Sequence, residues 1–301
     1  MVAPSNAGVT PALATRARTG ENPIWSESER ALYWIDIEQP AIHRFQPETD
    51  AHDWWEMPCA IGGMALCRSG AVLAALRMGL ARIDLKSGRF DLLRAAPYNP
   101  LRHRFNEAKC DARGRFWVGT KHEPLRAPDG TAPKADAAQP LRVFSGGRLA
   151  ERRACAAIAN GLAWSPDSRT MYFSDSDRRT IWAFDFDLDS AALYSQRVFA
   201  RFEQREGTPD GATIDADGFY WCALYGGARI LRFAPDGRLD REIPLPVSQP
   251  TMCAFGGPDC ETLYVTTAAH GVSPESEPLA GALFHIRPGV KGVPASLFDD
   301  G

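Results

Sequence analysis

Side-chain oxygens recur at one position of a repeating pattern in this 301-residue chain. Each lies five residues before a turn rich in Asp, Gly, Ser and Pro, which an apolar, aromatic strand follows. If the repeats form superimposable units around a ring, equivalent positions near the start of an inner strand converge on its axis. Two carboxylates and two amides facing one another stay unsatisfied unless a cation or ordered water lies between them. The four residues are Glu21, Asn106, Asn160 and Asp210, and Gly62 and Met252 occupy the same position in the other two repeats.

The chemistry that this oxygen set favours is the binding of one divalent metal ion. No His or Cys occupies these positions, so hard ions such as Ca²⁺, Mg²⁺ or Mn²⁺ are favoured over a closed structural zinc site. An open zinc or iron site is the alternative. Taken singly, Asn160-Gly161 and Asp210-Gly211 are also common turn dipeptides. The prediction therefore depends on the shared register of the residues.

The elements that must position these residues follow from the repeat itself. Successive copies start 41 to 54 residues apart, which is the range of four-stranded propeller blades and longer than leucine-rich or ankyrin units. Helical periodicity is nearly absent, and each copy continues into a second strand. The sequence predicts an all-β, six-bladed β-propeller with four-stranded antiparallel blades around a central metal-containing channel. The copies begin at Ser26, Cys67, Asp111, Ser165, Asp215 and Gly257.

The ends of the chain and one long interval complete the predicted organisation. Residues 19–301 are expected to form a single propeller domain, and residues 1–18 an N-terminal segment whose stretch from Ala12 to Arg18 adds a ring-closing strand. The longest interval between two repeat starts owes its additional length to residues 121–140, which are rich in Pro, Ala and Asp. We expect a loop over one face there, and a functional loop and an idle surface excursion are both consistent with it.

Composition and charge exclude several classes of function. A net charge of −3 offers no broad attraction for nucleic acid or for acidic lipid surfaces. The N-terminus lacks the apolar run of a signal peptide or a membrane span, so a cytoplasmic protein with no membrane partner and no obligate protein partner is predicted. The seven cysteines form an odd set without a Cys-x-x-Cys pair, which fits reduced thiols.

Four motifs around the oxygen residues resemble one known family. They are Gly-Glu-Asn-Pro-Ile-Trp from Gly20, Arg-Phe-Asn-Glu-Ala-Lys-Cys-Asp from Arg104, Ala-Asn-Gly-Leu-Ala-Trp-Ser from Ala159 and Pro-Asp-Gly-Ala-Thr-Ile-Asp from Pro209. In order and spacing, over about residues 19–267, the chain resembles the SMP-30/gluconolactonase/regucalcin-like family. The resemblance implies a six-bladed propeller that hydrolyses a small-molecule sugar lactone with one divalent ion, Ca²⁺, Mn²⁺, Mg²⁺ or Zn²⁺.

The resemblance also assigns roles to single residues. It implies Glu21, Asn160 and Asp210 as metal ligands. It implies Arg104 and Asn106 as substrate contacts, with Glu123 as the nearest match to a third. The chain departs from the family where Glu107-Ala108 replaces the usual Asp-Gly, a change that leaves the metal site intact and bears on the shape of the sugar pocket.

Hydrolysis of a lactone needs a polarised carbonyl, an activated water and stabilisation of the developing oxyanion, all of which a metal with open positions supplies. Asp210 is the predicted base that takes the water's proton. Arg104 and Asn106 are expected to orient the sugar by hydrogen bonds. His103 and His122 flank this region but lie outside the repeat register, so a histidine relay is the weaker alternative.

Three other functions compete with the lactonase prediction. Propellers with an axial metal also hydrolyse phosphotriesters or aryl esters, and a regucalcin-like chain is alternatively a calcium-binding regulatory protein without enzymatic activity. A protein-interaction propeller is disfavoured because the Gly-His and Trp-Asp signatures of WD40 blades are missing. Within the lactonase prediction, glucono-, galactono-, arabinono- and xylonolactones all present similar hydroxyl arrays.

Overall fold

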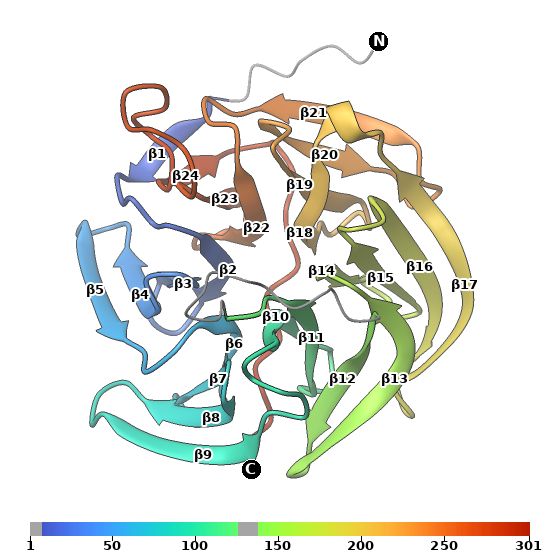
Figure 1. The fold of residues 1–301 in the computed structure, drawn as a ribbon. Helices are drawn as coiled ribbons and strands as arrows, with labels where there is room; N and C mark the ends of the chain where they lie inside the picture. Colours follow the sequence, from blue (N-terminus) through green and yellow to red (C-terminus); the bar gives the residue numbers. More distant parts are fainter. Residues whose placement is uncertain (1–7, 126–137) are drawn as a thin grey trace.

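The computed structural model describes residues 8–125 and 138–301. Within these residues, 24 strands form six separate four-stranded antiparallel sheets, which Figure 1 shows as blades arranged around one axis. The only helix in the described part is a single 3₁₀ turn, Gln204–Glu206. The predicted six-bladed β-propeller is therefore confirmed. Among the described residues, no helix is long and apolar enough to cross a membrane.

Five of the blades are built from four consecutive strands, with the first strand innermost (Figure 1). Blade one contains β2 (Gly20–Ser26), β3 (Ala31–Asp36), β4 (Ala41–Gln46) and β5 (Ala51–Glu56). Blade two contains β6 (Ile61–Leu66), β7 (Val72–Leu76), β8 (Gly79–Asp84) and β9 (Arg89–Ala95). Blade three contains β10 (His103–Cys110), β11 (Phe116–His122), β12 (Gln139–Ser145) and β13 (Arg148–Ala156). Blade four contains β14 (Ala159–Trp164), β15 (Thr170–Asp175), β16 (Thr180–Asp187) and β17 (Ala192–Arg201). Blade five contains β18 (Thr208–Ile214), β19 (Tyr220–Tyr225), β20 (Arg229–Phe233) and β21 (Leu239–Pro244).

The sixth blade joins the two ends of the chain. It contains β22 (Pro250–Gly256), β23 (Thr262–Thr267) and β24 (Leu283–Ile286), and its outermost strand is β1 (Thr10–Leu13). Thr10 pairs with His285 across this junction. The pairing strand lies slightly earlier in the chain than the predicted stretch from Ala12 to Arg18, and residues 1–7 of the predicted N-terminal segment lie outside the described residues. Strand pairing between distant parts of the sequence therefore closes the ring of blades.

The Asp of the repeated turn ties that turn to the following strand in two blades. The Asp111 carboxylate accepts a hydrogen bond from Trp117 Nε1 at 2.7 Å. In the same way Asp215 accepts one from Trp221 Nε1 at 2.9 Å and another from Arg232 Nε at 2.8 Å. Both tryptophans are fully buried. In these two blades the repeat visible in the sequence is thus a hydrogen-bonded unit.

Every inner strand carries a β-bulge at the repeat position that holds an oxygen residue in four of the six blades. The pairing of β2 with β3 shifts between Glu21 and Ile24, and corresponding shifts occur in the other five blades. In three blades the residue that follows this repeat position has a left-handed backbone conformation. These residues are Asn22 (φ 52°), Glu107 (φ 58°) and Gly161 (φ 63°). A bulge bends the strand and redirects its side chains, and a left-handed residue is most easily accommodated as glycine. The bulges turn the oxygen residues towards the axis.

The C-terminal tail spans one end of the axis. Gly292 N donates to Cys260 O at 2.8 Å in blade six, and Phe298 N donates to Leu66 O at 2.8 Å in blade two. Figure 1 shows this segment passing behind the middle of the ring. The opposite end of the axis is therefore the one where a site can open to solvent.

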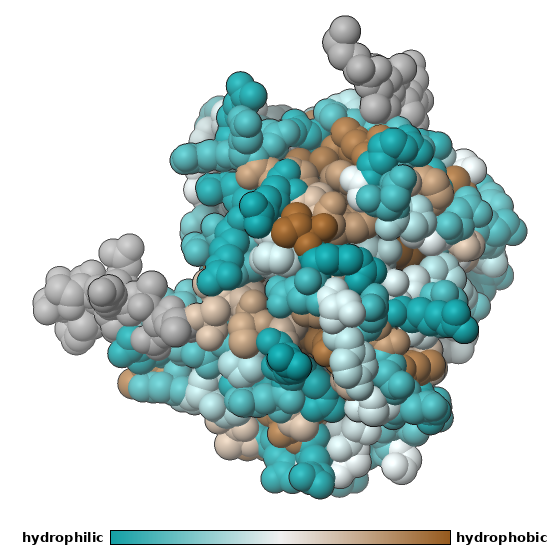
Figure 2. Space-filling view, turned by 90° about the vertical axis from the view of Figure 1, so that its right-hand side faces the viewer, coloured by the Kyte–Doolittle hydropathy of each residue, from teal (hydrophilic) through white to brown (hydrophobic). Residues whose placement is uncertain are grey.

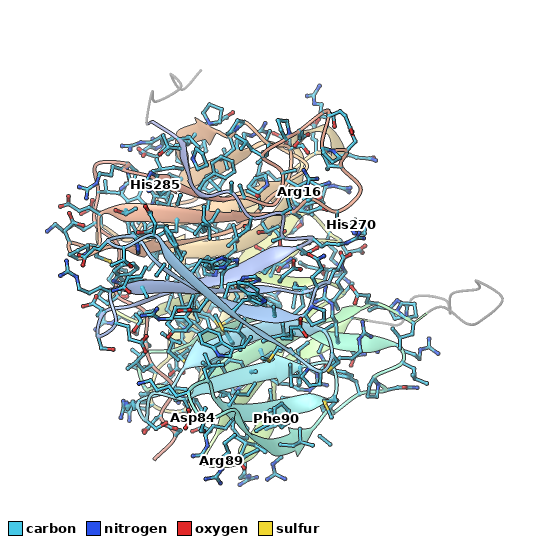
Figure 3. All side chains as sticks on the ribbon, turned by 90° about the vertical axis from the view of Figure 1, so that its left-hand side faces the viewer. Arg16, Asp84, Arg89, Phe90, His270 and His285 are labelled. Carbon is cyan, nitrogen blue, oxygen red and sulfur yellow. The ribbon has the colours of Figure 1, made fainter. Side chains whose placement is uncertain are left out.

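The outside of the propeller is mostly polar. Figure 2 shows a largely hydrophilic face with scattered apolar spots. In the side view of Figure 3, His270 lies at one edge of the molecule, and its Nδ1 lies 2.9 Å from Glu38 Oε2 of blade one. All seven cysteines are free, which confirms the prediction of unpaired thiols.

Candidate functional site

Hydrogen bonds connect the predicted oxygen residues of three adjacent blades. Asn106 Nδ2 on β10 donates to Asn160 Oδ1 on β14 at 3.0 Å. Asn160 Nδ2 donates to Ser176 Oγ at 2.8 Å, and Ser176 Oγ donates to the carbonyl of Pro209 at 2.6 Å. Pro209 directly precedes Asp210 on β18. The fold thus brings Asn106, Asn160 and the backbone of Asp210 together, as the register predicts.

Two carboxylates share this end of the axis with the amides. Burial raises the pKa of Glu21 to about 7, against the opposing influence of its hydrogen bond from Asn22 N and of the nearby Arg104. Burial and the neighbouring Glu21 and Glu107 carboxylates raise the pKa of Asp210 well above its usual value. Like charges in a poorly solvated place favour protonation unless a cation neutralises them.

The donor set at this position fits a hard divalent ion. Among the described residues, no three or more His, Cys, Asp or Glu side chains are grouped so that they could hold a metal. The candidate set instead combines the carboxylates of Glu21 and Asp210 with the amide oxygen of Asn160. Oxygen ligands of this kind suit calcium, magnesium or manganese.

Arg104 and Glu123 form an ion pair beside the amides. The Arg104 side chain is 3% exposed, and its Nε donates to Glu123 Oε2 at 2.9 Å. Its Nη1 donates to Phe105 O at 3.0 Å and to Asn106 Oδ1. Although burial opposes ionisation, Arg104 and Lys121 hold the pKa of Glu123 below its usual range. The three residues predicted as substrate contacts therefore form one connected group.

Two cations of this group were not assigned a role from the sequence. Arg77, just after β7, donates Nη2 to Glu123 Oε2 and Nη1 to the carbonyls of Pro100, His103 and Glu123. The Lys121 Nζ atom lies 3.6 Å from Glu123 Oε1. Neither falls in the repeat register or in a quoted motif. Arg77 reaches Glu123 because blade two packs against blade three, whereas Lys121 lies two residues before Glu123 in blade three itself. The sequence predicts residue 121 only as the first residue of a loop. Residues 126–137 of that loop lie outside the described part.

Glu107 and Ala108, where the chain departs from the family pattern, face the interior of the propeller. Glu107 is 3% exposed, and its Oε1 accepts a hydrogen bond from Leu162 N in blade four at 3.0 Å. Its Oε2 has no hydrogen-bond partner among the described residues. Burial and the charge of Glu21 raise the pKa of Glu107 to about 8. A Cβ on Gly63 would lie 2.5 Å from the Cβ of Ala108, so glycine in blade two makes room for this alanine.

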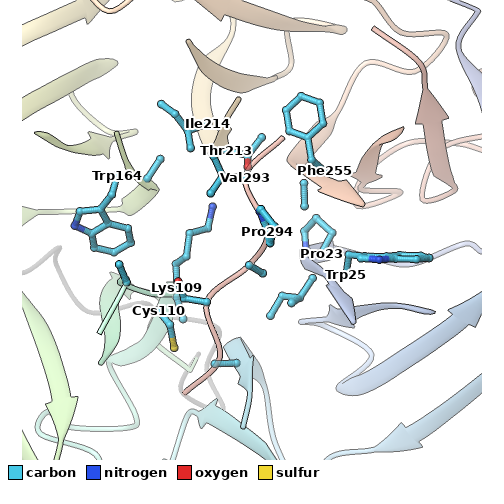
Figure 4. A pocket seen from close by; sticks show the side chains of 18 of the residues that line it. Pro23, Trp25, Lys109, Cys110, Trp164, Thr213, Ile214, Phe255, Val293 and Pro294 are labelled. Atoms are coloured by element: carbon cyan, nitrogen blue, oxygen red, sulfur yellow. The ribbon is translucent and has the colours of Figure 1, made fainter. Parts of the chain in front are cut away.

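A cavity of about 150 Å³ lies towards the other end of the axis, beneath the C-terminal tail. Figure 4 shows the Lys109 side chain extending there beside Thr213 and Pro294, and its Nζ donates to Ala212 O at 2.6 Å. The remaining lining is mainly apolar and includes Trp25, Trp164, Ile214, Phe255 and Val293. None of the predicted site residues lines this cavity, so it is separate from the oxygen-rich end.

His103 and His122 pack against each other at the edge of the site. Their rings are edge to face, with centroids 5.1 Å apart. His103 is buried. The contact is a packing arrangement between β10 and β11, and a histidine relay stays an untested alternative.

Comparison with known proteins places this chain in a family. A model of the SMP-30/gluconolactonase/LRE-like region matches residues 19–269, which is most of the chain and includes every predicted site residue. The chain belongs to this family.

Named relatives within the family include lactonases. A 6-deoxy-6-sulfogluconolactonase of Pseudomonas putida is 36% identical over 93% of this chain and 94% of its own length. The pentonolactonase XacC of Haloferax volcanii is 32% identical over 95% of this chain and 96% of its own length. Among solved structures, a luciferin-regenerating enzyme is 26% identical, with a TM-score of 0.86 over 97% of this chain and 99% of the other.

Proposed function

We propose that this protein is a metal-dependent hydrolase that converts a sugar lactone into the corresponding aldonic acid. The observation that carries the proposal is the grouping of Glu21, Asn160 and Asp210 beside the Arg104–Glu123 ion pair at the open end of the propeller axis. Two family members named as lactonases match this chain over nearly its whole length. We further propose that the protein acts in carbohydrate metabolism in the cytoplasm.

Glu21, Asn160 and Asp210 would hold the metal ion. When bound, a divalent ion of this kind supplies Lewis acidity for the lactone carbonyl and lowers the pKa of an attacking water. The raised pKa values of Glu21 and Asp210 support this assignment, because two carboxylates that are poorly ionised alone become stable anions beside a cation. Calcium, manganese, magnesium and zinc are the candidates.

Asp210 would act as the general base. Its carboxylate takes a proton from the water whose oxygen attacks the lactone carbonyl carbon, and the ring carbon–oxygen bond then breaks. The departing ring oxygen takes up this proton from the Asp210 carboxyl and becomes a hydroxyl of the open aldonic acid.

Arg104, Asn106 and Glu123 would bind the sugar. The guanidinium and amide donate hydrogen bonds to hydroxyl or ring oxygens, and the Glu123 carboxylate accepts from hydroxyls. Glu123 also holds the guanidinium of Arg104 in place through the 2.9 Å contact. Fixing the sugar in this way holds the carbonyl where the water attacks.

The decisive experiment is Asp210→Ala, assayed with glucono-1,5-lactone and each of the four metals. We expect the rate of hydrolysis to fall at least ~1000-fold because base and metal ligand are lost together. The circular dichroism spectrum should stay that of the folded protein. Asp236→Ala, which removes an exposed turn carboxylate of the same blade, is the matched control and should keep full activity.

Chelation should abolish turnover, and one restored metal should return it. Normal turnover by the Asp210→Ala variant would refute the assigned base. Turnover of paraoxon-like esters in preference to lactones would favour the phosphotriesterase or arylesterase alternative. Metal binding without turnover of any aldonolactone would favour a calcium-binding regulatory protein.

A further inference from the structure

Three cations surround one carboxylate at the mouth of the candidate site. Glu123 Oε2 accepts hydrogen bonds from Arg104 Nε and Arg77 Nη2, and Glu123 Oε1 lies 3.6 Å from Lys121 Nζ. One negative charge therefore faces three positive charges. The excess is two positive charges within one small cluster.

The three cations differ in how they are held. The side chains of Arg77 and Arg104 are 11% and 3% exposed, and both also donate to backbone carbonyls. Lys121 is 34% exposed and, within residues 8–125 and 138–301, forms one ion pair, with Glu123. An ammonium has three donors, so Lys121 has capacity to bind a further acceptor that arrives from solvent.

Neighbouring carboxylates do not cancel this excess when the site is loaded. Glu21 and Asp210 would be neutralised by the divalent ion that they hold under the proposed function. Glu107 lies deeper and is in electrostatic contact with Lys109. The mouth is thus left with a positive field, and such a field attracts and orients an anion.

We propose that the natural substrate is a sugar lactone with an anionic substituent, a carboxylate, sulfonate or phosphate, on the chain remote from the lactone carbonyl, and that Lys121 binds this group. The inference rests on the proposed function and narrows its substrate class. A lysine ammonium is a compact charge with rotatable donors, so it pairs with any of these anions. Arg77 adds its charge through its hydrogen bond to Glu123. Arg104 remains available to the sugar.

The test compares two lactones that differ only in the remote substituent, glucono-1,5-lactone and its 6-phospho derivative. We expect the wild-type protein to have a kcat/KM at least about tenfold higher for the phosphorylated lactone, because a hydrogen-bonded charge pair discriminates by this order. Lys121→Met should lower the ratio of the two kcat/KM values about tenfold or more. Lys121→Arg should restore most of the ratio, and Lys86→Met, an exposed lysine in blade two, should leave it unchanged.

Two outcomes would overturn the inference and leave the proposed function standing. One is a wild-type ratio of one or less. The other is a Lys121→Met variant that lowers both kcat/KM values equally. If neither lactone is turned over with any metal, the proposed function fails, and calorimetric binding of 6-phosphogluconate against gluconate then decides the anion preference. Tighter binding of the phosphate that weakens in Lys121→Met supports the inference, and equal binding overturns it.

Discussion

Two sets of carboxylates are buried in this propeller, and they differ in how completely they are hydrogen-bonded. Asp215 Oδ1 accepts from the backbone of Asp217 at 3.1 Å and of Phe219 at 2.9 Å, and its Oδ2 accepts from Trp221 Nε1 and Arg232 Nε. Asp111 has a matching set in blade three. These turn carboxylates have hydrogen-bond donors on both oxygens, and they tie the turn to the neighbouring strands of their own blade.

The axial carboxylates are buried almost as deeply and have far fewer donors. Glu21 accepts from its neighbour's backbone N–H, and Glu107 accepts from Leu162 N, whereas Glu107 Oε2 has no partner in the described part of the chain. Both have raised pKa values. The axial carboxylates thus have unused acceptor capacity that the turn carboxylates lack, which agrees with the proposal that they bind a cation.

The largest effect on stability is expected from Asp215→Ala. The change leaves the Arg232 guanidinium and the Trp221 indole without their buried partner, so the free energy of unfolding should fall by about 3–5 kcal/mol. Urea denaturation measures it, with Asp236→Ala as the exposed control that should change stability by less than about 0.5 kcal/mol. A loss below about 1 kcal/mol would show that the turn carboxylates are not structural.

The metal-free protein should become less stable as the pH rises from 5 to 8. Glu21 and Glu107 have folded pKa values of about 7 and about 8 against an ordinary value of 4.5, so in this range the folded state binds more protons than the unfolded state. The free energy of unfolding then decreases with pH, by on the order of 3 kcal/mol for Glu21 once it is fully ionised. Lys109 has a lowered pKa and acts in the opposite direction at higher pH.

Urea titrations in chelator at several pH values between 5 and 8 measure this slope. Added metal should flatten it, because the ion offsets the charges of Glu21 and Asp210. A free energy of unfolding that rises with pH in chelator would contradict the assignment of raised pKa values to the axial set.

A smaller effect, of opposite sign to Asp215→Ala, is expected from Glu107→Gln. At pH 8 the amide removes a charge that is costly to bury, so the metal-free protein should gain about 1–3 kcal/mol. The pH slope should also become shallower. Glu27→Gln, at an exposed position, is the matched control, and destabilisation by Glu107→Gln at pH 8 would mean that the Glu107 charge is well paired.

The smallest effect should come from Trp221→Phe. The phenyl ring fills most of the same space but removes one of four donors to Asp215, so about 1–2 kcal/mol of stability should be lost. Thermal or urea unfolding measures the change. A loss as large as that of Asp215→Ala would show that the indole N–H, rather than the full set of donors, stabilises the turn.

The sequence by itself determined the blades and the axial residues. A blade is a local unit of consecutive strands and turns, so its period is present in the chain. The position of Glu21, Asn106, Asn160 and Asp210 within that period was enough to predict that they share one end of the axis. The structure adds the reason, which is a β-bulge at the same place in every inner strand.

Only the tertiary structure decided which further residues join them. Arg77 meets Glu123 because blade two packs against blade three, and Glu107 reaches Leu162 across to blade four. The ring closes where Thr10 pairs with His285. The first two contacts join residues of different blades, and the third joins the two ends of the chain within blade six. All three bring together residues that are far apart in the sequence, so no local pattern of residue types provides a signal for them.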